Sequence, residues 1–466
     1  MDCKTLLTSP EGKTLEFKRD TSSLKQIMKT IVAFANTAGG VIVIGRGDDG
    51  DVIGVEDPLF VEEQLSNSIA DSIAPMIMPD IEILSVDGKS ILCVRVAHWP
   101  GPFYLKSEGA ERGAYIRIGS STRMAGPEFI AEIKRVGQGI SFDRLACPEL
   151  TITDLDNEAI RTTFNTTGQI ITEQKLLSLG VLVPYGDRYV PSNGGVILFG
   201  SEKAKEFHFP DARVSCALFQ GHDKAHFLDR LDIEGGVLSS LEEVPKFIRR
   251  NSRLASRIDG FIREDIPAYP DVALREVLIN AIAHADYSLT GMRIMISIFS
   301  DRLEIQNPGF LPFGMSLDSF KAGTSMVRNR TIAKVLRQLS LMEEWGSGYN
   351  RVITACNEYG YPIPQWQEIG PALRVTFPPH PLTRTPHAQQ AKESVPVNVP
   401  VNVPINKRQQ WFLNQLSKGN KCRPSDIAKK WTVTEKTAKR DISDLQKKDL
   451  VVFIGPPKTG RYQLKN

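Results

Sequence analysis

The sequence Ala273-Leu-Arg-Glu-Val-Leu-Ile-Asn-Ala-Ile-Ala-His-Ala-Asp-Tyr287 predicts a helix with two different faces. Glu276, Asn280 and His284 recur at every fourth position, so they share one stripe of the helix. The opposite side gives the helix an apolar face to bury. That face consists of Leu274, Leu278, Ala281 and Ala285. A carboxylate that accepts a proton and an amide oxygen that binds hard cations suit a site for Mg²⁺, phosphate and an activated water. The same stripe also suits a solvated polar face.

The residues that follow predict a strand hairpin and two glycine turns. Residues 292–300 alternate as a strand, and residues 303–306 return as a second strand after an Asp-Arg turn. Asn307-Pro-Gly309 then breaks the chain, and Gly346-Ser-Gly348 forms a second glycine motif. Glycines beside a helix start let backbone N–H groups approach a phosphate, and the arginines at 328 and 330 can neutralise it.

This order of an Asn-bearing helix, a hairpin, a glycine turn, a lid and a second glycine motif resembles the gyrase and histidine-kinase type of ATP-binding fold. It is most similar to the divergent branch found beside Schlafen/AlbA-like domains in predicted bacterial transcriptional regulators. The resemblance implies ATP with Mg²⁺, with Asn280 as a metal ligand and Glu276 as the base if ATP is hydrolysed. Asn307 stands where the family has an Asp that contacts adenine, which changes the hydrogen-bonding pattern offered to the base. The residues expected at the nucleotide are Asn280, His284, Asn307, Gly309, Thr324, Ser325, Arg328, Asn329, Gly346 and Gly348.

The composition is that of an ordinary globular protein, long enough for three or four domains. The 466 residues are 41% hydrophobic and 24% charged. The six cysteines are scattered without a Cys-x-x-Cys pair, which favours reduced thiols in the cytoplasm and argues against a zinc ribbon. No apolar run has the length of a membrane span, and the first residues lack the apolar core of a signal peptide. We therefore expect a cytoplasmic protein that does not enter a membrane.

The first part of the chain has a characteristic order of motifs. Residues 14–18 alternate as a strand, 24–35 form an amphipathic helix, and 41–44 form a buried strand. Asp48-Asp-Gly50 makes a tight turn before a return strand at 52–55. The order Glu-x-x-x-x-Glu-Phe-Lys, helix, Ala-Asn-Thr-x-Gly-Gly, strand, Asp-Asp-Gly resembles the Schlafen/AlbA-like domain over about the first 135 residues.

The Schlafen resemblance carries two implications. In the branch that acts on RNA, two glutamates and an aspartate hold a divalent metal, and the matching residues here are Glu11, Glu16 and Asp49. Mg²⁺ or Mn²⁺ held by them would activate water for phosphodiester attack. The other implication is binding of RNA or single-stranded DNA without chemistry. In that case Glu16 pairs with Lys18 or Arg19, and the Asp residues simply make a turn.

The segments between these motifs are less informative. We interpret residues 143–271 as a scaffold packed against the nucleotide fold. Within it, 195–200 is predicted to be a buried strand and 233–262 a long, mostly helical stretch. Past residue 377, frequent prolines block both helix and sheet ladders, so 378–404 is predicted to be an extended linker.

The tail from residue 405 is strongly basic. It carries 15 Lys and Arg against 5 Asp and Glu, whereas the rest of the chain carries 42 against 49. Helices are predicted at 407–416, 424–430 and 435–448, followed by strands at 450–454 and 461–464, and this order resembles a winged helix-turn-helix. The residues expected to contact DNA are Thr434, Lys436, Thr437, Lys439 and Arg440. Short hydroxyls and long cations at a helix start fit phosphate anchoring and major-groove reading. A protein-docking module is the alternative.

From these features we expect an α/β (α+β) multidomain protein. Its expected parts are a Schlafen/AlbA-like nucleic-acid-binding domain (1–140), a linking α+β scaffold (141–255), a divergent Bergerat-type ATP-binding domain (256–378), a proline-rich linker (379–405) and a winged helix-turn-helix (406–466). The leading interpretation is an ATP-responsive, DNA-binding transcriptional regulator. We expect a homo-oligomer, because winged-helix DNA-binding proteins commonly dimerise on two-fold symmetric DNA sites. The alternatives are a metal-dependent nuclease of the Schlafen type that is gated by nucleotide and acts in defence, and a scaffold whose nucleotide pocket is degenerate.

Overall fold

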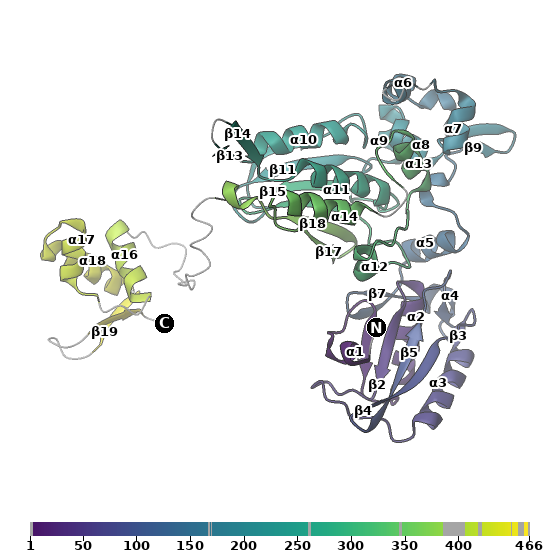
Figure 1. The fold of residues 1–466 in the computed structure, drawn as a ribbon, viewed down its shortest axis with the longest axis horizontal. Helices are drawn as coiled ribbons and strands as arrows, with labels where there is room; N and C mark the ends of the chain where they lie inside the picture. Colours follow the sequence, from purple (N-terminus) through teal and green to yellow (C-terminus); the bar gives the residue numbers. More distant parts are fainter. Residues whose placement is uncertain are drawn as a thin grey trace. The chain divides into compact units, whose positions relative to one another are not determined.

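The chain divides into two compact units, unit 1 (Met1–Arg384) and unit 2 (Thr385–Asn466) (Figure 1). The structure is a computed structural model that describes residues 3–165, 168, 170–259, 262–343, 347–384, 406–417, 422–448, 450–454 and 461–464. No helix in these ranges is long and apolar enough to cross a membrane.

The N-terminal part of unit 1 is built on a four-stranded sheet in the order β1-β2-β5-β4. The strands are β1 (Leu15–Lys18), β2 (Gly40–Ile44), β4 (Asp80–Val86) and β5 (Lys89–Val96), with only the β1–β2 pair parallel. Helix α2 (Leu24–Asn36) packs on the sheet, because its apolar residues recur at helical spacing and form one core with β2 and β5. The other elements are α1 (Cys3–Thr8), α3 (Pro58–Ser72), β3 (Ile73–Ala74), β6 (Tyr104–Leu105), α4 (Gly109–Arg112), β7 (Tyr115–Ile118), β8 (Ser121–Met124) and α5 (Pro127–Gly137).

The return strand predicted at 52–55 is wrong. The chain forms only a single bridge there, between Arg46 and Val52. The N–H groups of Ile53 and Gly54 both donate to Gly45 O, so the backbone turns instead of extending along a neighbour.

The middle of unit 1 contains a small helical region. Its elements are η1 (Phe142–Arg144), η2 (Ile152–Asp154), α6 (Asn157–Asn165), α7 (Glu173–Leu179), β9 (Leu182–Tyr185), β10 (Arg188–Pro191), α8 (Asn193–Phe199) and α9 (Glu202–His208). The buried strand predicted at 195–200 is therefore wrong, because residues 195–199 lie in α8 and Gly200 is its C-cap. Ser192 Oγ accepts a hydrogen bond from Gly195 N at 3.0 Å and caps the helix start. Every residue of α8 is buried, and a short apolar run buried on all sides looks alike as helix or strand.

A six-stranded sheet in the order β12-β11-β15-β16-β18-β17 forms the largest layer of unit 1. Its strands are β11 (Val214–Phe219), β12 (Phe227–Asp232), β15 (Ile294–Ile298), β16 (Leu303–Pro308), β17 (Gln365–Ile369) and β18 (Ala372–Phe377). Helices α10 (Ser240–Asn251), α11 (Asp271–His284) and α14 (Gly348–Glu358) cover one face of this sheet (Figure 1). The hydrophobic core between these layers continues into α13 (Arg330–Gln338) and the helical region. Two strands of the sheet, β11 and β12, thus come from the region interpreted as scaffold.

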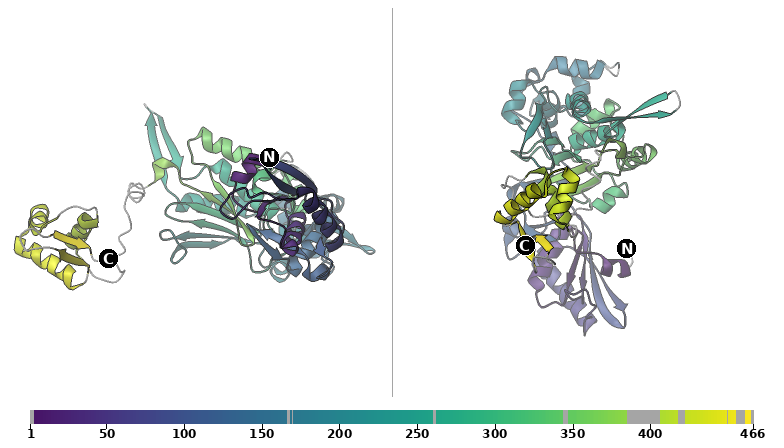
Figure 2. Two further views of the ribbon diagram at one scale, coloured as in Figure 1. Left: turned by 90° about the horizontal axis from the view of Figure 1, so that it is seen from below. Right: turned by 90° about the vertical axis from the view of Figure 1, so that its left-hand side faces the viewer.

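The long helical stretch predicted at 233–262 is only partly correct. Helix α10 ends at Asn251, and Ser252 is extended at φ −122° and ψ 161°. The chain then continues as β13 (Leu254–Asp259), which pairs with β14 (Ile262–Pro267) in a hairpin that stands out from the sheet (Figure 2). The sequence pattern did not reveal this strand, because the arginines of the stretch are compatible with both an exposed helix face and an exposed strand face.

Unit 2 has three helices followed by a pair of antiparallel strands. They are α16 (Lys407–Ser417), α17 (Pro424–Trp431), α18 (Glu435–Lys447), β19 (Val451–Ile454) and β20 (Arg461–Leu464). Phe412, Ile427 and Leu445 are fully buried at the centre of its small core. Most of the predicted linker, residues 385–405, lies outside the described residues. Before it, η3 (Pro381–Thr383) ends unit 1, where His380 N donates to Ala268 O at 2.8 Å.

Candidate functional site

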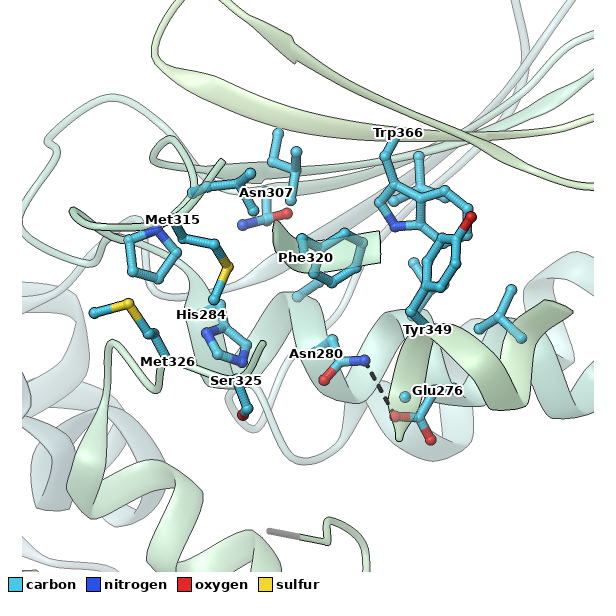
Figure 3. Close-up of a pocket in the computed structure, with 18 of the residues that line it drawn as sticks. Glu276, Asn280, His284, Asn307, Met315, Phe320, Ser325, Met326, Tyr349 and Trp366 are labelled. Carbon is cyan, nitrogen blue, oxygen red and sulfur yellow. Dashed lines mark hydrogen bonds between the residues drawn. The ribbon is translucent and has the colours of Figure 1, made fainter. Parts of the chain in front are cut away.

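A pocket opens between α11, α14, the β16–β18 part of the sheet and the segment 310–326 (Figure 3). It has a volume of about 950 Å³, counting the part open to solvent. Six of the ten residues expected at the nucleotide line this pocket: Asn280, His284, Asn307, Thr324, Ser325 and Gly348. Glu276, the expected base, lines it as well. Gly346 lies outside the described residues.

The stripe of Glu276, Asn280 and His284 on α11 faces the pocket, as their spacing of four residues predicted. Asn280 Nδ2 donates to Glu276 Oε1 at 3.1 Å, and Arg351 Nε lies 3.7 Å from Glu276 Oε2. Glu276 is buried with 7% of its surface exposed, so its carboxylate is held in one place. Within the described part of the chain nothing donates to Asn280 Oδ1, the oxygen assigned to a metal. The pair therefore offers a fixed carboxylate and an open amide oxygen side by side.

Gly348 brings the start of α14 against this pair. A Cβ atom at Gly348 would lie 2.5 Å from Glu276 Oε1 and 3.1 Å from Asn280 Nδ2. Any larger residue would have to displace the buried carboxylate or the helix. Gly348 is the first residue of α14, where backbone N–H groups have no intrahelical acceptor, so the glycine places free donors beside the pocket.

His284, at the other end of the stripe, is a neutral ring. Burial of the imidazole, and then the positive charge of Arg328, lower the pKa of His284 to about 4. A neutral imidazole donates through one nitrogen and accepts through the other. In Figure 3 it points into the pocket next to Ser325. It can therefore hydrogen-bond a ligand without adding charge.

An aromatic wall completes the pocket and was not predicted from the sequence. Phe320, Tyr349 and Trp366 lie with ring centroids 5.0–5.9 Å apart. They come from α12 (Leu317–Lys321), α14 and β17. Asn307 lies deeper, near Met315 (Figure 3), and its Nδ2 donates to Pro308 O at 3.3 Å. The pocket thus combines a polar floor on α11 with apolar and aromatic walls.

The structure does not bring Arg328, Asn329 and Gly309 to the pocket lining. Arg328 Nη1 lies 2.5 Å from Glu132 Oε1 and 2.9 Å from Asp286 Oδ2, so two carboxylates already hold it. Asn329 Nδ2 donates to the carbonyls of Ala283 and Ala285 at 3.1 and 2.7 Å and fixes the end of α11. Gly309, at φ +93°, makes a turn in which a Cβ would lie 2.7 Å from Asp286 Cβ. These three positions build the site and do not face it.

Glu132 and Asp286 were missed because neither belongs to a recognisable motif. Burial raises the pKa of Glu132 to about 7; Arg328 opposes this rise and the neighbouring Asp286 carboxylate adds to it. Glu132 belongs to α5 of the N-terminal part, whereas Arg328 follows the pocket segment. The cluster therefore links the N-terminal part of unit 1 to the part that contains the pocket.

The three carboxylates expected at an N-terminal metal are each engaged separately. Glu16 Oε1 lies 2.5 Å from Lys18 Nζ, and Glu16 Oε2 lies 2.9 Å from Arg117 Nη1, which is itself buried. Glu11 Oε1 accepts from Phe17 N at 2.8 Å, and Asp49 Oδ1 accepts from Asp51 N at 3.2 Å in its turn. In the ranges that the structure describes, no group of three His, Cys, Asp or Glu is arranged to hold a metal ion. The pairing of Glu16 with Lys18 is thus present, with Arg117 as an unforeseen second partner.

The residues expected to contact DNA gather at the start of α18. Thr434 caps the helix, and its Oγ1 accepts from Thr437 N at 3.3 Å. Lys436, Lys439 and Arg440 are exposed, whereas Ala438, Ile442 and Leu445 on the other side of the helix are buried. The helix therefore presents cations and a hydroxyl to solvent together.

Two family models match parts of the chain. Residues 11–126 match the family described as "Schlafen, AlbA_2", and residues 291–377 match the family described as "Putative ATP-dependent DNA helicase recG C-terminal". The chain thus carries a Schlafen AlbA_2 domain and a RecG-like, ATPase-type domain, and the predicted mixed α/β multidomain class is confirmed. Together the two domains point to a nucleic-acid-related protein. None of the curated proteins compared matches the chain.

Two solved structures are similar in sequence. The DIP2311 protein of Corynebacterium diphtheriae is 19% identical, covering 99% of this chain and 98% of that one, with a TM-score of 0.42. The N-terminal domain of a "Putative ATP-dependent DNA Helicase RecG-related Protein" of Nitrosomonas europaea is 31% identical, covering 26% of this chain and 92% of that one, with a TM-score of 0.22. Neither TM-score reaches 0.5.

Proposed function

We propose that the protein is an ATP-responsive, DNA-binding transcriptional regulator. The observation that carries this proposal is the segment 310–326, because it lines the nucleotide pocket and also packs into the Schlafen AlbA_2 part of unit 1. A ligand that moves this segment therefore changes its contacts with a nucleic-acid-related domain.

ATP with Mg²⁺ fits the residues of the pocket. Asn280 Oδ1 is a hard oxygen without a protein partner among the described residues, and Gly348 leaves a cradle that a Cβ would fill. Thr324 and Ser325 offer hydroxyls to phosphate, and the aromatic wall offers a surface for a base. When bound, Mg²⁺ would neutralise phosphate charge. Glu276 is the residue positioned to accept a proton from water if the nucleotide is hydrolysed.

The segment 310–326 reaches the N-terminal part through the Phe313 side chain and through backbone N–H groups. Phe313 is 9% exposed and packs in a cluster with Ala114, Ile116, Ala125, Ile130 and Ile133. Gly314 N donates to Thr37 O at 2.5 Å. Lys13 Nζ lies 2.7 Å from Glu368 Oε1, and the same oxygen accepts from Leu311 N at 2.9 Å. Leu311 lines the pocket, so one short segment contacts both nucleotide site and N-terminal part.

DNA binding is assigned to unit 2, which we interpret as a winged helix-turn-helix with α18 as its recognition helix. The exposed cations at the start of α18 support this assignment, as does the excess of 15 Lys and Arg over 5 Asp and Glu from residue 405 onward. Residues 455–460, which would form the wing, lie outside the described residues. We further propose a homo-oligomer, because winged-helix proteins commonly dimerise on two-fold DNA sites. We propose a cytoplasmic location, because the six scattered cysteines favour reduced thiols.

The nuclease alternative gains no support from the geometry around Glu16. It requires Glu11, Glu16 and Asp49 at one Mg²⁺ or Mn²⁺ ion. Instead, Glu16 neutralises the buried guanidinium of Arg117, a role that would be lost if the carboxylate turned toward a metal.

The role of the segment is tested by Phe313→Ala. The wild-type protein should show slower amide hydrogen exchange over residues 114–133 when ATP and Mg²⁺ are added, because the segment tightens against this region. Phe313→Ala removes the buried anchor, a loss of roughly 3–5 kcal/mol of packing. It should bind ATP, since Phe313 does not line the pocket, but should lose the protection at 114–133.

The matched control is Phe207→Ala, the same change at a side chain that is 78% exposed. It should behave as wild type. If ATP slows exchange around the pocket of the wild-type protein but leaves 114–133 unchanged, the segment does not transmit occupancy and the proposed coupling is wrong.

A further inference from the structure

A second concave surface of unit 1 lies along α13 and shares no lining residue with the nucleotide pocket. One wall is the end of α7, from Leu177 to Gly180, and the volume is about 830 Å³, counting the part open to solvent. The basic residues that line it are Arg144, Arg330, Lys334 and Arg337. No carboxylate lines it. We call this surface the basic groove.

In the part of the chain that the structure describes, three of the four cations of the basic groove have no carboxylate partner. Arg330 Nη1 donates to Gly139 O at 2.9 Å, and Lys334 Nζ donates to Ser178 O. Both acceptors are neutral carbonyls. Within the described part of the chain, no ion pair involves Arg144, Arg330 or Lys334. All three side chains are exposed, so the groove offers charge and hydrogen-bond donors to solvent.

The sequence of α13 is difficult to explain by stability alone. Arg330, Lys334 and Arg337 are spaced by four and three residues and form one stripe, and the helix contains no Asp or Glu. Arg330 stands in the first turn, where the helix dipole disfavours a cation. The buried carboxylate of Asp143 accepts from Ile332 N at 2.9 Å and stabilises the helix start instead. A solvated face would usually alternate acidic and basic residues.

We propose that the basic groove binds the phosphate backbone of a nucleic-acid strand. Guanidinium groups bind phosphate through two parallel hydrogen bonds, and several spaced cations suit a chain of phosphates better than a single one. The stripe from Arg330 to Arg337 extends about 10 Å along the helix axis. That length corresponds to about three steps of one duplex strand at roughly 3.4 Å per step. The groove lies outside both sites of the proposed function. Binding at the groove can therefore be tested independently of binding at those two sites.

The test measures the binding of a single-stranded DNA oligonucleotide to the full chain carrying Lys439→Ala and Arg440→Ala, which removes two of the three cations assigned to DNA on α18. In this background, Arg144→Glu with Lys334→Glu should weaken binding about tenfold or more. The slope of log affinity against log salt should become shallower by about two. The matched control is Lys203→Glu with Lys224→Glu, the same charge change at exposed cations that do not line the groove, and it should have a much smaller effect.

Two further measurements make the result independent of folding defects in the variants. Photo-cross-linking of the same oligonucleotide to the wild-type chain should label peptides within 327–337 and 177–180. Lys334→Gln, which keeps a donor toward Ser178 O, should reduce this labelling without lowering the melting temperature. If wild-type labelling falls only outside these peptides, or if both charge-reversal pairs weaken binding equally, the proposal is overturned. Loss of labelling when inorganic phosphate matches the DNA phosphate concentration would assign the groove to free phosphate and would also overturn it.

Discussion

Asn280→Ala is expected to lower the affinity for ATP with Mg²⁺ by at least about 100-fold, because it removes the oxygen assigned to the metal, and loss of even an outer-shell partner costs 10–100-fold. The fold should survive. The only side-chain hydrogen bond that Asn280 makes among the described residues is to Glu276. Isothermal calorimetry with ATP, ADP and GTP measures the affinity, and thermal unfolding without nucleotide measures the stability.

Asn350→Ala is the control for this result. Asn350 is exposed on α14 and does not line the pocket, so its loss should change neither the heat of binding nor the melting temperature. Absence of any heat from the wild-type protein with all three nucleotides would reject the pocket and favour the scaffold alternative. An Asn280→Ala variant that binds ATP as tightly as wild type would reject the metal role of Asn280.

Lys439→Ala combined with Arg440→Ala is expected to weaken duplex DNA binding and to flatten its salt dependence. A site with six to ten phosphate contacts loses roughly 10³–10⁵-fold in affinity between about 50 and 200 mM salt, because each contact releases counterions. Removing two contacts should make the slope of log affinity against log salt shallower by about two. Fluorescence anisotropy of a labelled duplex over a salt series measures both quantities.

Lys447→Ala serves as the control, because Lys447 is exposed at the opposite end of the same helix. It should retain nearly the whole wild-type salt slope. Affinity of the wild-type chain that does not change with salt would contradict the assignment of unit 2 to DNA and would favour a protein-docking module.

Local periodicity explains which parts of the site were predictable. The stripe of Glu276, Asn280 and His284 follows from the helical repeat within 15 residues, and the structure places all three on the pocket. The same holds for α18, where Thr434 caps the helix and the cations follow it. In both cases the grouped side chains lie within a few turns of one helix. Their relative positions can therefore be predicted from the spacing of the residues along the sequence.

The residues whose predicted ligands differ from the partners seen in the structure are those whose neighbours come from distant parts of the chain. Arg328 looked like a phosphate ligand because it follows a glycine turn, but Glu132, 196 residues earlier, holds its guanidinium. Glu16 looked like a metal ligand, but Arg117, 101 residues later, neutralises it. The aromatic wall was missed for the same reason, since Phe320, Tyr349 and Trp366 belong to three separate elements. No pattern within a short window reveals such contacts.

Regulation of DNA binding by nucleotide is tested by the affinity of the full chain for duplex DNA, measured with and without ATP and Mg²⁺. Linkage requires that any effect of ATP on DNA affinity equals the effect of DNA on ATP affinity, so both titrations should give the same factor. We predict a change of at least about fivefold for the wild-type protein and none for Asn280→Ala. Equal DNA affinities with and without nucleotide, for a protein shown to bind both, would mean that nucleotide occupancy does not regulate DNA binding.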